Sequence, residues 1–331
     1  MALHLQYRSM FLIGGRCELS AAFADELAVW GPQSIPGRVP TLAEANAYCQ
    51  RLATTHYENF PIVSCLLPRR LHQHFYNIYA YCRWADDLAD EVADPVRALK
   101  LLAWWRAELA GCYAERAIHP VFVALVPTIR MFNIPIEPFA DLISAFEQDQ
   151  SVREYDTFEQ LVEYCRRSAN PVGRLVLYLC QQATTENFRW SDAVCTGLQL
   201  ANFWQDVARD LDIGRIYLPH EDCRQFGYSR EDLNSRVTND PFLRLMAFQV
   251  ERARSWLSPW RDATLPELAP FPWRLQVDIE LFARGGERIL DRIARIGYRV
   301  WDKRPVVTKA DVAWLFFACA GRGLVRKIRG V

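Results

Sequence analysis

The sequence predicts an all-α protein, and three observations support that prediction. Helix-type spacing of apolar residues recurs from about residue 41 onward, strand-like alternation is scarce, and helix-capping signals are frequent. A capping hydroxyl followed three residues later by a side chain that caps in return marks a helix start, and proline is favoured at the first helical position. The predicted starts are Thr41 with Glu44, Asp94-Pro95, Thr157 with Gln160, Ser229 with Asp232, and Thr308 with Asp311.

Proline and glycine predict where helices end or restart. The first 40 residues contain Gly14-Gly15 and Pro36-Gly37, which indicate an N-terminal extension, residues 1–40, lying on or outside the folded domain. No repeat and no shift in composition divides the remainder, so residues 41–331 are predicted to form a single domain. The expected breaks within it are Pro68, His119-Pro120, Ile134-Pro135, Gly214 and the stretch 266–272.

The amino-acid composition indicates which kinds of ligand and partner the protein can be expected to bind. Apolar residues make up 51% of the chain and aromatic residues 13%, which suits a large core and equally a deep cavity for a hydrocarbon ligand. The 39 basic and 39 acidic residues balance, so no general attraction to nucleic acid is expected. Ten cysteines without a C-x-x-C pair indicate free thiols in a reducing cytosol.

No membrane anchor is predicted. The apolar stretch near residues 10–13 is too short for a signal peptide, and the late apolar run 312–320 is shorter than the roughly 20 residues of a membrane span. The basic residues that follow, Arg322, Arg326, Lys327 and Arg329, could contact lipid phosphates, and a solvated helix end explains them equally well. The expected location is cytoplasmic, with peripheral contact at the inner face of the membrane as one alternative.

A first carboxylate cluster lies in the predicted helix that contains residues 79–91. Asp86 and Asp90 are four residues apart and share one helical face, with Arg83 one turn earlier. The two carboxylates repel each other unless a cation lies between them, and Mg²⁺ is commonly bound by one or two carboxylates plus substrate phosphates. The alternative is a solvated acidic face on which Arg83 pairs with Asp87.

A second cluster follows a polar stripe. Four polar residues occupy the 3, 4, 4 spacing that normally carries the apolar core of a helix, while the other faces carry large apolar residues. The stripe must therefore face something polar inside the protein. Gly214 is predicted to end this helix, and Arg215 and Tyr217 follow where they can close over a diphosphate. The stripe consists of Gln199, Asn202, Asp206 and Asp210.

Two such helices could face one another across a bundle, with metal ions between them and a diphosphate bridging the ions. Mg²⁺ and arginine would neutralise the charge that develops on a departing diphosphate. An apolar, aromatic cavity would keep the resulting carbocation away from bulk water. The two clusters together therefore predict an enzyme that ionises an isoprenyl diphosphate.

At these two motifs the sequence resembles the squalene and phytoene synthase family of head-to-head prenyl synthases, over nearly all of residues 41–320. The resemblance implies an isoprenoid-synthase catalytic domain whose helical bundle surrounds a central cavity, with three Mg²⁺ ions at the diphosphate. It implies a proton-handling or cation-steering role for Tyr164. Tyr79, Arg83 and Arg215 are implied as diphosphate contacts. The implied metal ligands are Asp86, Asp90, Asn202, Asp206 and Asp210.

Three departures from the family pattern are similar to its hydroxysqualene synthase branch. Gln205 stands where arginine usually precedes the first aspartate of the second motif, and the segments 168–173 and 56–61 also differ. That branch ionises presqualene diphosphate and lets water capture the cation, within squalene and hopanoid biosynthesis. NADPH is then not expected, and the upstream presqualene diphosphate synthase is a candidate partner. We hypothesise that Asn170 holds the water, and Gln205, Asn202 and Tyr217 are further candidate contacts of the diphosphate.

Other readings remain open at this point. The chain could condense two farnesyl or geranylgeranyl diphosphates to presqualene diphosphate, squalene or phytoene. It could be a non-catalytic helical scaffold, although both acidic motifs are intact, or a Mg²⁺-dependent phosphohydrolase. His72 and His74 point about 200° apart on a helix, so joint metal binding is not expected. No G-x-G-x-x-G motif predicts a Rossmann dinucleotide site.

Overall fold

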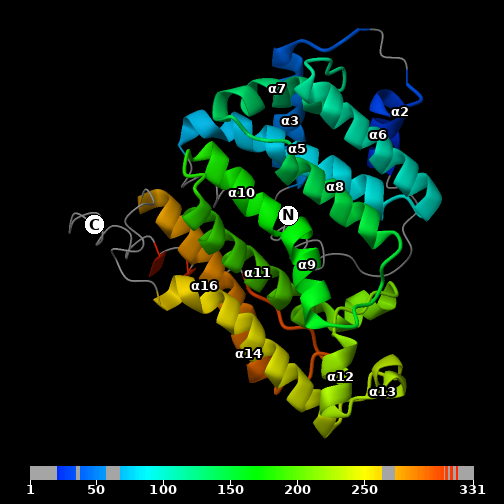
Figure 1. The fold of residues 1–331 in the computed structure, drawn as a ribbon, viewed down its shortest axis with the longest axis vertical. Coiled ribbons are helices and arrows are strands. Elements are labelled where there is room, and N and C mark those ends of the chain that lie inside the picture. Colours follow the sequence, from blue (N-terminus) through cyan, green and yellow to red (C-terminus); the bar gives the residue numbers. More distant parts are fainter. Residues whose placement is uncertain are drawn as a thin grey trace. The chain divides into compact units, whose positions relative to one another are not determined.

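The computed structural model describes residues 21–34, 38–56, 68–262 and 273–308, together with 310, 311, 314, 315, 318 and 319. These residues form helices without a β-strand (Figure 1). Their only strand-like pairing is a single bridge between Glu154 and Ile216. The all-α prediction is confirmed. The predicted break at 266–272, the segment 57–61 and the basic residues from Arg322 to Arg329 lie outside the described residues.

The chain divides into two compact units. The α5 unit comprises Ile13–Val152 and Arg174–Ala183, and the α11 unit comprises Arg153–Gly173 and Thr184–Val331 with Met1–Leu12. The prediction of one catalytic domain over residues 41–331 remains a prediction. The α5 unit contains α2 (Ala21–Trp30), α3 (Leu42–His56), α5 (Arg69–Asp90), α6 (Pro95–Tyr113), α7 (Pro120–Phe132) and α8 (Glu137–Asp149). The α11 unit contains α9 (Phe158–Ser168), the start of α10 (Asn170–Leu179), α11 (Thr185–Asp212), α12 (His220–Phe226), α13 (Arg230–Asn234), α14 (Asp240–Asp262) and α16 (Trp273–Arg295).

Helix boundaries follow the predicted capping signals. Thr157 and Gln160 form a full capping box at the start of α9, and Asp94 accepts a hydrogen bond from the Val96 N–H ahead of Pro95. Gly214, with φ of +73°, follows the end of α11, where a left-handed conformation suits glycine. No helix in the described part of the chain is long and apolar enough to cross a membrane.

The core of the α5 unit is aromatic and surrounds one buried histidine. Trp84 of α5 stacks on Trp105 of α6 with ring centroids 5.4 Å apart, and the His119 ring lies 4.6 Å from that of Trp84. The Nδ1 atom of His119 accepts a hydrogen bond from the Val121 N–H and caps α7. Phe23 of α2, from the N-terminal extension, packs edge-on against Trp84 at 5.2 Å, so part of that extension contributes to the core.

Three long helices, α11, α14 and α16, pack side by side in the α11 unit (Figure 1). Glycines permit their close approach. A Cβ atom added at Gly197 would lie 2.7 Å from a methyl carbon of Leu257, and one added at Gly286 would lie 2.9 Å from methyl carbons of Leu198 and Leu257. Since α11 uses these apolar faces to pack, its polar stripe must face elsewhere.

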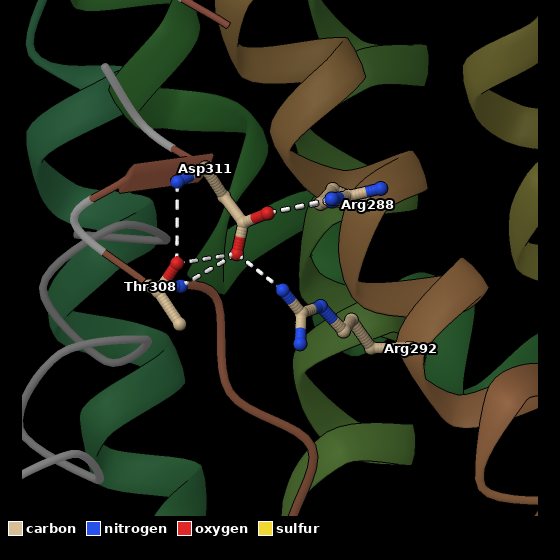
Figure 2. A network of polar contacts seen from close by, with 4 residues as sticks. All are labelled: Arg288, Arg292, Thr308 and Asp311. Carbon is tan, nitrogen blue, oxygen red and sulfur yellow. Dashed lines mark hydrogen bonds and ion pairs between the residues drawn. The ribbon is translucent and has the colours of Figure 1, made fainter. Parts of the chain in front are cut away.

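The segment after α16 is anchored to that helix by a polar network. Asp311 accepts hydrogen bonds from Arg288 at 2.6 Å and from Arg292 at 2.5 Å, and the four residues of the network are drawn in Figure 2. The Thr308 N–H and hydroxyl also donate to Asp311, and the Asp311 N–H donates back to the Thr308 hydroxyl. This reciprocal capping was predicted from the sequence, whereas the two arginines were not. One buried carboxylate therefore holds the C-terminal segment against α16.

Replacing Asp311 with asparagine should weaken this anchor. Asp311→Asn removes the charge that pairs with two partly buried arginines, and we expect the free energy of unfolding to fall by about 1–3 kcal/mol. Urea unfolding followed by circular dichroism measures the change. Asp240→Asn serves as the control, because Asp240 pairs with Arg244 on the exposed surface of α14, and a loss as large in the control would contradict the assignment.

His119 should make the fold sensitive to acid. Burial lowers the pKa of His119 from 6.5 to about 3. Below pH 6.5 the unfolded chain binds a proton that the folded chain resists, so stability falls as the pH drops toward 3, by up to about 1.4 kcal/mol per pH unit. His119→Asn keeps a capping acceptor and removes the titration, so its unfolding free energy should depend less on pH over that range. A His119→Asn slope equal to wild type would contradict this explanation.

Candidate active site

The first carboxylate cluster lies in the last turns of α5 and is largely buried. Asp86 is 1% exposed and Asp87 is 6% exposed, whereas Asp90 at the end of the helix is exposed. The alternative of a solvated acidic face is therefore wrong for the first two carboxylates. Tyr79, Arg83, Asp86 and Asp90 follow 4, 3, 4 spacing, so they share one side of α5.

Arg83 is held by carboxylates of its own helix. Its guanidinium lies 2.5 Å from Asp87 and 3.5 Å from Glu91, and its side chain is only 10% exposed. The pairing with Asp87 was foreseen as an alternative, and that with Glu91 was not. Burial raises the pKa of the Tyr79 hydroxyl, with Arg83 opposing the shift and the carboxylates adding to it. Tyr79 therefore stays protonated at neutral pH and can donate a hydrogen bond.

The second cluster lies on α11, where the first three residues of the predicted polar stripe are buried and Asp210 is partly exposed. Gln199 is 1% exposed, Asn202 is 7% and Asp206 is 3%. Oε1 of Gln199 and Oδ1 of Asn202 find no hydrogen-bond partner among the described residues. Buried polar atoms of this kind carry a desolvation cost that a ligand can remove. Burial, and secondarily the charge of Asp206, raises the pKa of Asp210 well above its usual value.

Asp206 is paired with an arginine that the sequence analysis missed. Nε of Arg304 lies 2.5 Å from one carboxylate oxygen of Asp206, and Nη2 lies 3.2 Å from the other. The two residues are 98 positions apart, and no local pattern could have related them. Arg215, Arg304 and Arg209 each oppose the rise in the pKa of the neighbouring Asp210 by their positive charge.

Gln205 contacts the segment that carries Arg304. Its side-chain Nε2 donates a hydrogen bond to the carbonyl oxygen of Pro305 at 2.6 Å. Adjacent residues of a helix point about 100° apart, so Gln205 extends from a different side of α11 than Asp206. The structure thus gives Gln205 a contact of its own with the chain, while its expected contact with diphosphate stays a prediction.

Four aromatic rings gather beside the second cluster. Tyr217 stacks on Phe203 with centroids 3.8 Å apart, and Tyr155 and Tyr164 stack against Tyr217 at 5.9 and 6.1 Å. Tyr164 and Tyr217 were predicted site residues, whereas Tyr155 was missed because nothing in its local sequence marks it. Electron-rich ring faces attract cations. The cluster can therefore stabilise positive charge next to the carboxylates.

A pocket within the α11 unit lies at the C-terminal end of α11, beside the aromatic rings and the second carboxylate cluster. It brings together the predicted residues Asp210, Arg215 and Tyr217 with apolar side chains of α11 and α13. The pocket is lined by Phe203, Val207, Asp210, Leu211, Arg215, Ile216, Tyr217, Leu218, Leu233 and Trp301.

Asn170 begins α10 and is held from α11. It is 3% exposed, and its Oδ1 accepts a hydrogen bond of 2.9 Å from the Thr196 hydroxyl. Gly173, one turn later, has no side chain, and a Cβ there would lie 2.7 Å from Sγ of Cys195. The orientation of Asn170 is thus set by close packing of α10 on α11 and by one hydrogen bond.

The donor atoms suit Mg²⁺, although neither cluster is a closed metal site. Carboxylate and amide oxygens are the ligands Mg²⁺ prefers, and the buried, unpartnered Oδ1 of Asn202 lies in the same stripe as Asp206. Among the described residues, no group of three or more His, Cys, Asp or Glu side chains could hold a metal ion. A metal bound here would therefore take part of its coordination from a ligand such as a diphosphate.

The fold is that of the isoprenoid synthases, and comparisons with known proteins define the family. The sequence model of the squalene/phytoene synthase family matches residues 53–311. Phytoene synthase of Arthrospira platensis is 30% identical over 280 residues, covering 81% of this chain and 89% of its own. The chain belongs to the squalene/phytoene synthase family and is an enzyme of the head-to-head isoprenoid synthase class.

Solved structures agree with this assignment. Squalene synthase HpnC from Alicyclobacillus acidocaldarius shares 43% identity with a TM-score of 0.73, covering 78% of this chain and 95% of that one. A dehydrosqualene synthase in complex with a ligand has a TM-score of 0.74 at 22% identity, covering 85% and 97% of the two chains, and supports the fold alone. The sequence-based resemblance and the isoprenoid-synthase fold are both confirmed.

Proposed function

We propose that this enzyme converts presqualene diphosphate to hydroxysqualene and diphosphate with Mg²⁺. The observation that carries the proposal is the buried stripe of α11, in which polar oxygens occupy positions that would otherwise form core. The buried amide oxygens of Gln199 and Asn202 in this stripe carry a desolvation cost that a polar ligand would offset. Identity of 43% with squalene synthase HpnC, against 30% with the phytoene synthase above, supports a squalene-type substrate.

In this proposal the carbon–oxygen bond to diphosphate breaks, and the leaving group departs with the electron pair. Asp86, Asp90, Asn202, Asp206 and Asp210 would hold Mg²⁺, which supplies charge neutralisation at the phosphate oxygens. Opening of the cyclopropyl ring of the substrate then moves the positive charge to another carbon of the hydrocarbon. Tyr164 and the rings stacked beside it favour a cation by their electron-rich faces.

Water ends the proposed reaction. Its oxygen forms the new carbon–oxygen bond and its proton passes to solvent or to the diphosphate, so no hydride and no NADPH are required. Asn170 is proposed to orient this water, since its amide is fixed by Thr196. The presence of Gln205 where the family usually has arginine supports water capture, because it lowers the positive charge close to the diphosphate.

A condensing synthase is the second candidate, favoured by the phytoene synthases among the relatives. The 15-cis-phytoene synthase of Synechocystis sp. is 30% identical over 305 residues, covering 86% of this chain and 89% of its own. Such an enzyme would join two farnesyl or geranylgeranyl diphosphates and use the same carboxylate clusters. Substrate and product therefore separate the two candidates.

Incubation with Mg²⁺ and separate substrates tests the function. Presqualene, farnesyl and geranylgeranyl diphosphates are each supplied with and without NADPH, and products are identified by mass spectrometry. We expect hydroxysqualene from presqualene diphosphate without NADPH. Asp86→Asn and Asp206→Asn should each lower kcat by about 100-fold or more, because they remove charge that supports the leaving group. Asp240→Asn, on the exposed surface, should retain activity, and phytoene from geranylgeranyl diphosphate would refute the first proposal in favour of the second.

Asn170 should control the partition of the cation. Asn170→Ala removes the amide that would hold the water, and we expect a lower share of hydroxysqualene among all products, by about three- to tenfold, as for loss of one hydrogen bond. Thr196→Val should shift the share in the same direction by less, because it only frees the amide. Thr196→Ser keeps the hydroxyl and should restore the wild-type ratio. An unchanged share in Asn170→Ala would exclude this role.

A further inference from the structure

The ion pair of Arg304 and Asp206 covers the atoms that a metal would need. Both carboxylate oxygens face the guanidinium, at 2.5 and 3.2 Å. The side chains are 15% and 4% exposed, so water screens the pair little. Two-pronged arginine–carboxylate pairs in such surroundings are among the stronger hydrogen-bonded contacts. In the structure, the carboxylate of Asp206 is therefore paired with the guanidinium of Arg304.

The backbone that follows Arg304 is held at two points. The Pro305 carbonyl accepts the 2.6 Å hydrogen bond from Gln205 of α11. Six residues beyond, Asp311 is bound by Arg288 and Arg292 of α16 (Figure 2). The segment cannot leave α11 without breaking these contacts. A change of partner by Arg304 is accordingly a side-chain rotation, with the backbone staying in reach of Asp206.

Arg304 and a divalent cation compete for the carboxylate of Asp206. The guanidinium satisfies both oxygens of Asp206, and a dication at coordination distance from them would also lie close to its positive charge. Bringing the metal to Asp206 alone therefore requires the loss of a buried ion pair. A diphosphate changes this balance, because it offers the guanidinium an alternative anion while it brings ligand oxygens for the metal.

We propose that Arg304 couples metal binding at the α11 cluster to the presence of diphosphate. Without the anion, Arg304 holds Asp206 and keeps the affinity of the cluster for a divalent cation low. With the anion, the guanidinium pairs with phosphate oxygens and Asp206 is released to the metal. Gln205 is a positioning residue for this exchange. The inference rests on the part of the proposed function that makes Asp206 a metal ligand, and not on the identity of the hydrocarbon substrate.

Equilibrium dialysis with Mn²⁺ tests the coupling without turnover. Bound Mn²⁺ per chain is measured with the full-length protein, alone and with inorganic pyrophosphate, after correction for the manganese–pyrophosphate complex. Arg304→Gln should raise the affinity for Mn²⁺ alone by about fivefold or more, within the usual range of coupling between sites. Because linkage is reciprocal, the gain that pyrophosphate confers should shrink by a similar factor in the variant.

Three further variants make the test specific. Asp206→Asn added to Arg304→Gln should abolish the gained affinity, which assigns it to this carboxylate. Arg304→Lys keeps a charge but cannot cover two oxygens equally, so it should show a smaller gain, and it carries the test if Arg304→Gln does not fold by circular dichroism. Arg299→Gln, whose guanidinium pairs with the exposed Asp302 on the same segment, should bind Mn²⁺ as wild type does.

The result that overturns the coupling is an unchanged Mn²⁺ affinity in both folded Arg304 variants. A gain that survives Asp206→Asn would overturn it as well, since another site would then be responsible. Failure of the proposed function looks different: presqualene diphosphate would not be converted, while the linkage between Mn²⁺ and pyrophosphate would persist. Conversely, if presqualene diphosphate is converted normally and the Arg304 variants bind Mn²⁺ as wild type does, only the proposed coupling is refuted.

Discussion

The burial of carboxylates on α11 is the constraint on which the α11 unit depends. An ionised carboxylate away from water is costly unless a cation or several donors compensate for it. Arg304 compensates Asp206 directly. The other faces of the helix must then supply the packing, and Gly197 allows the close contact with α14 that this requires. The packing of α11, the compensation of its buried charge and the anchoring of the C-terminal segment therefore depend on one another.

The two acidic helices use internal arginines in different ways. On α5, Arg83 pairs with Asp87 and Glu91 of its own helix, and neither of these carboxylates is an implied metal ligand. On α11, the compensating guanidinium comes from a distant segment and occupies an implied ligand itself. The Arg83–Asp87 pair on α5 involves no implied metal ligand. The Arg304–Asp206 pair on α11 does, so Arg304 can compete with a metal ion for Asp206. In our proposal, this asymmetry makes α11 the cluster whose metal affinity depends on the bound anion.

Gln205 has a structural role that its sequence motif does not predict. Its contrast with arginine suggested a reaction ended by water, through lower positive charge near the diphosphate. The structure adds a second consequence, because the amide donates to the Pro305 carbonyl and holds the segment that bears Arg304. Both consequences follow from one side chain. A substitution at this position would therefore change charge and tethering together.

The sequence alone determined the helical class, the capped helix starts and the polar stripe of α11, because these depend on periodicity and on contacts three or four residues apart. It also carried the family resemblance. Only the tertiary structure decided that Asp86 is buried, that Tyr155 joins the rings around Tyr217, and that Arg304 holds Asp206. Those contacts join residues far apart in the chain, and their formation depends on how whole helices pack, which no local pattern encodes.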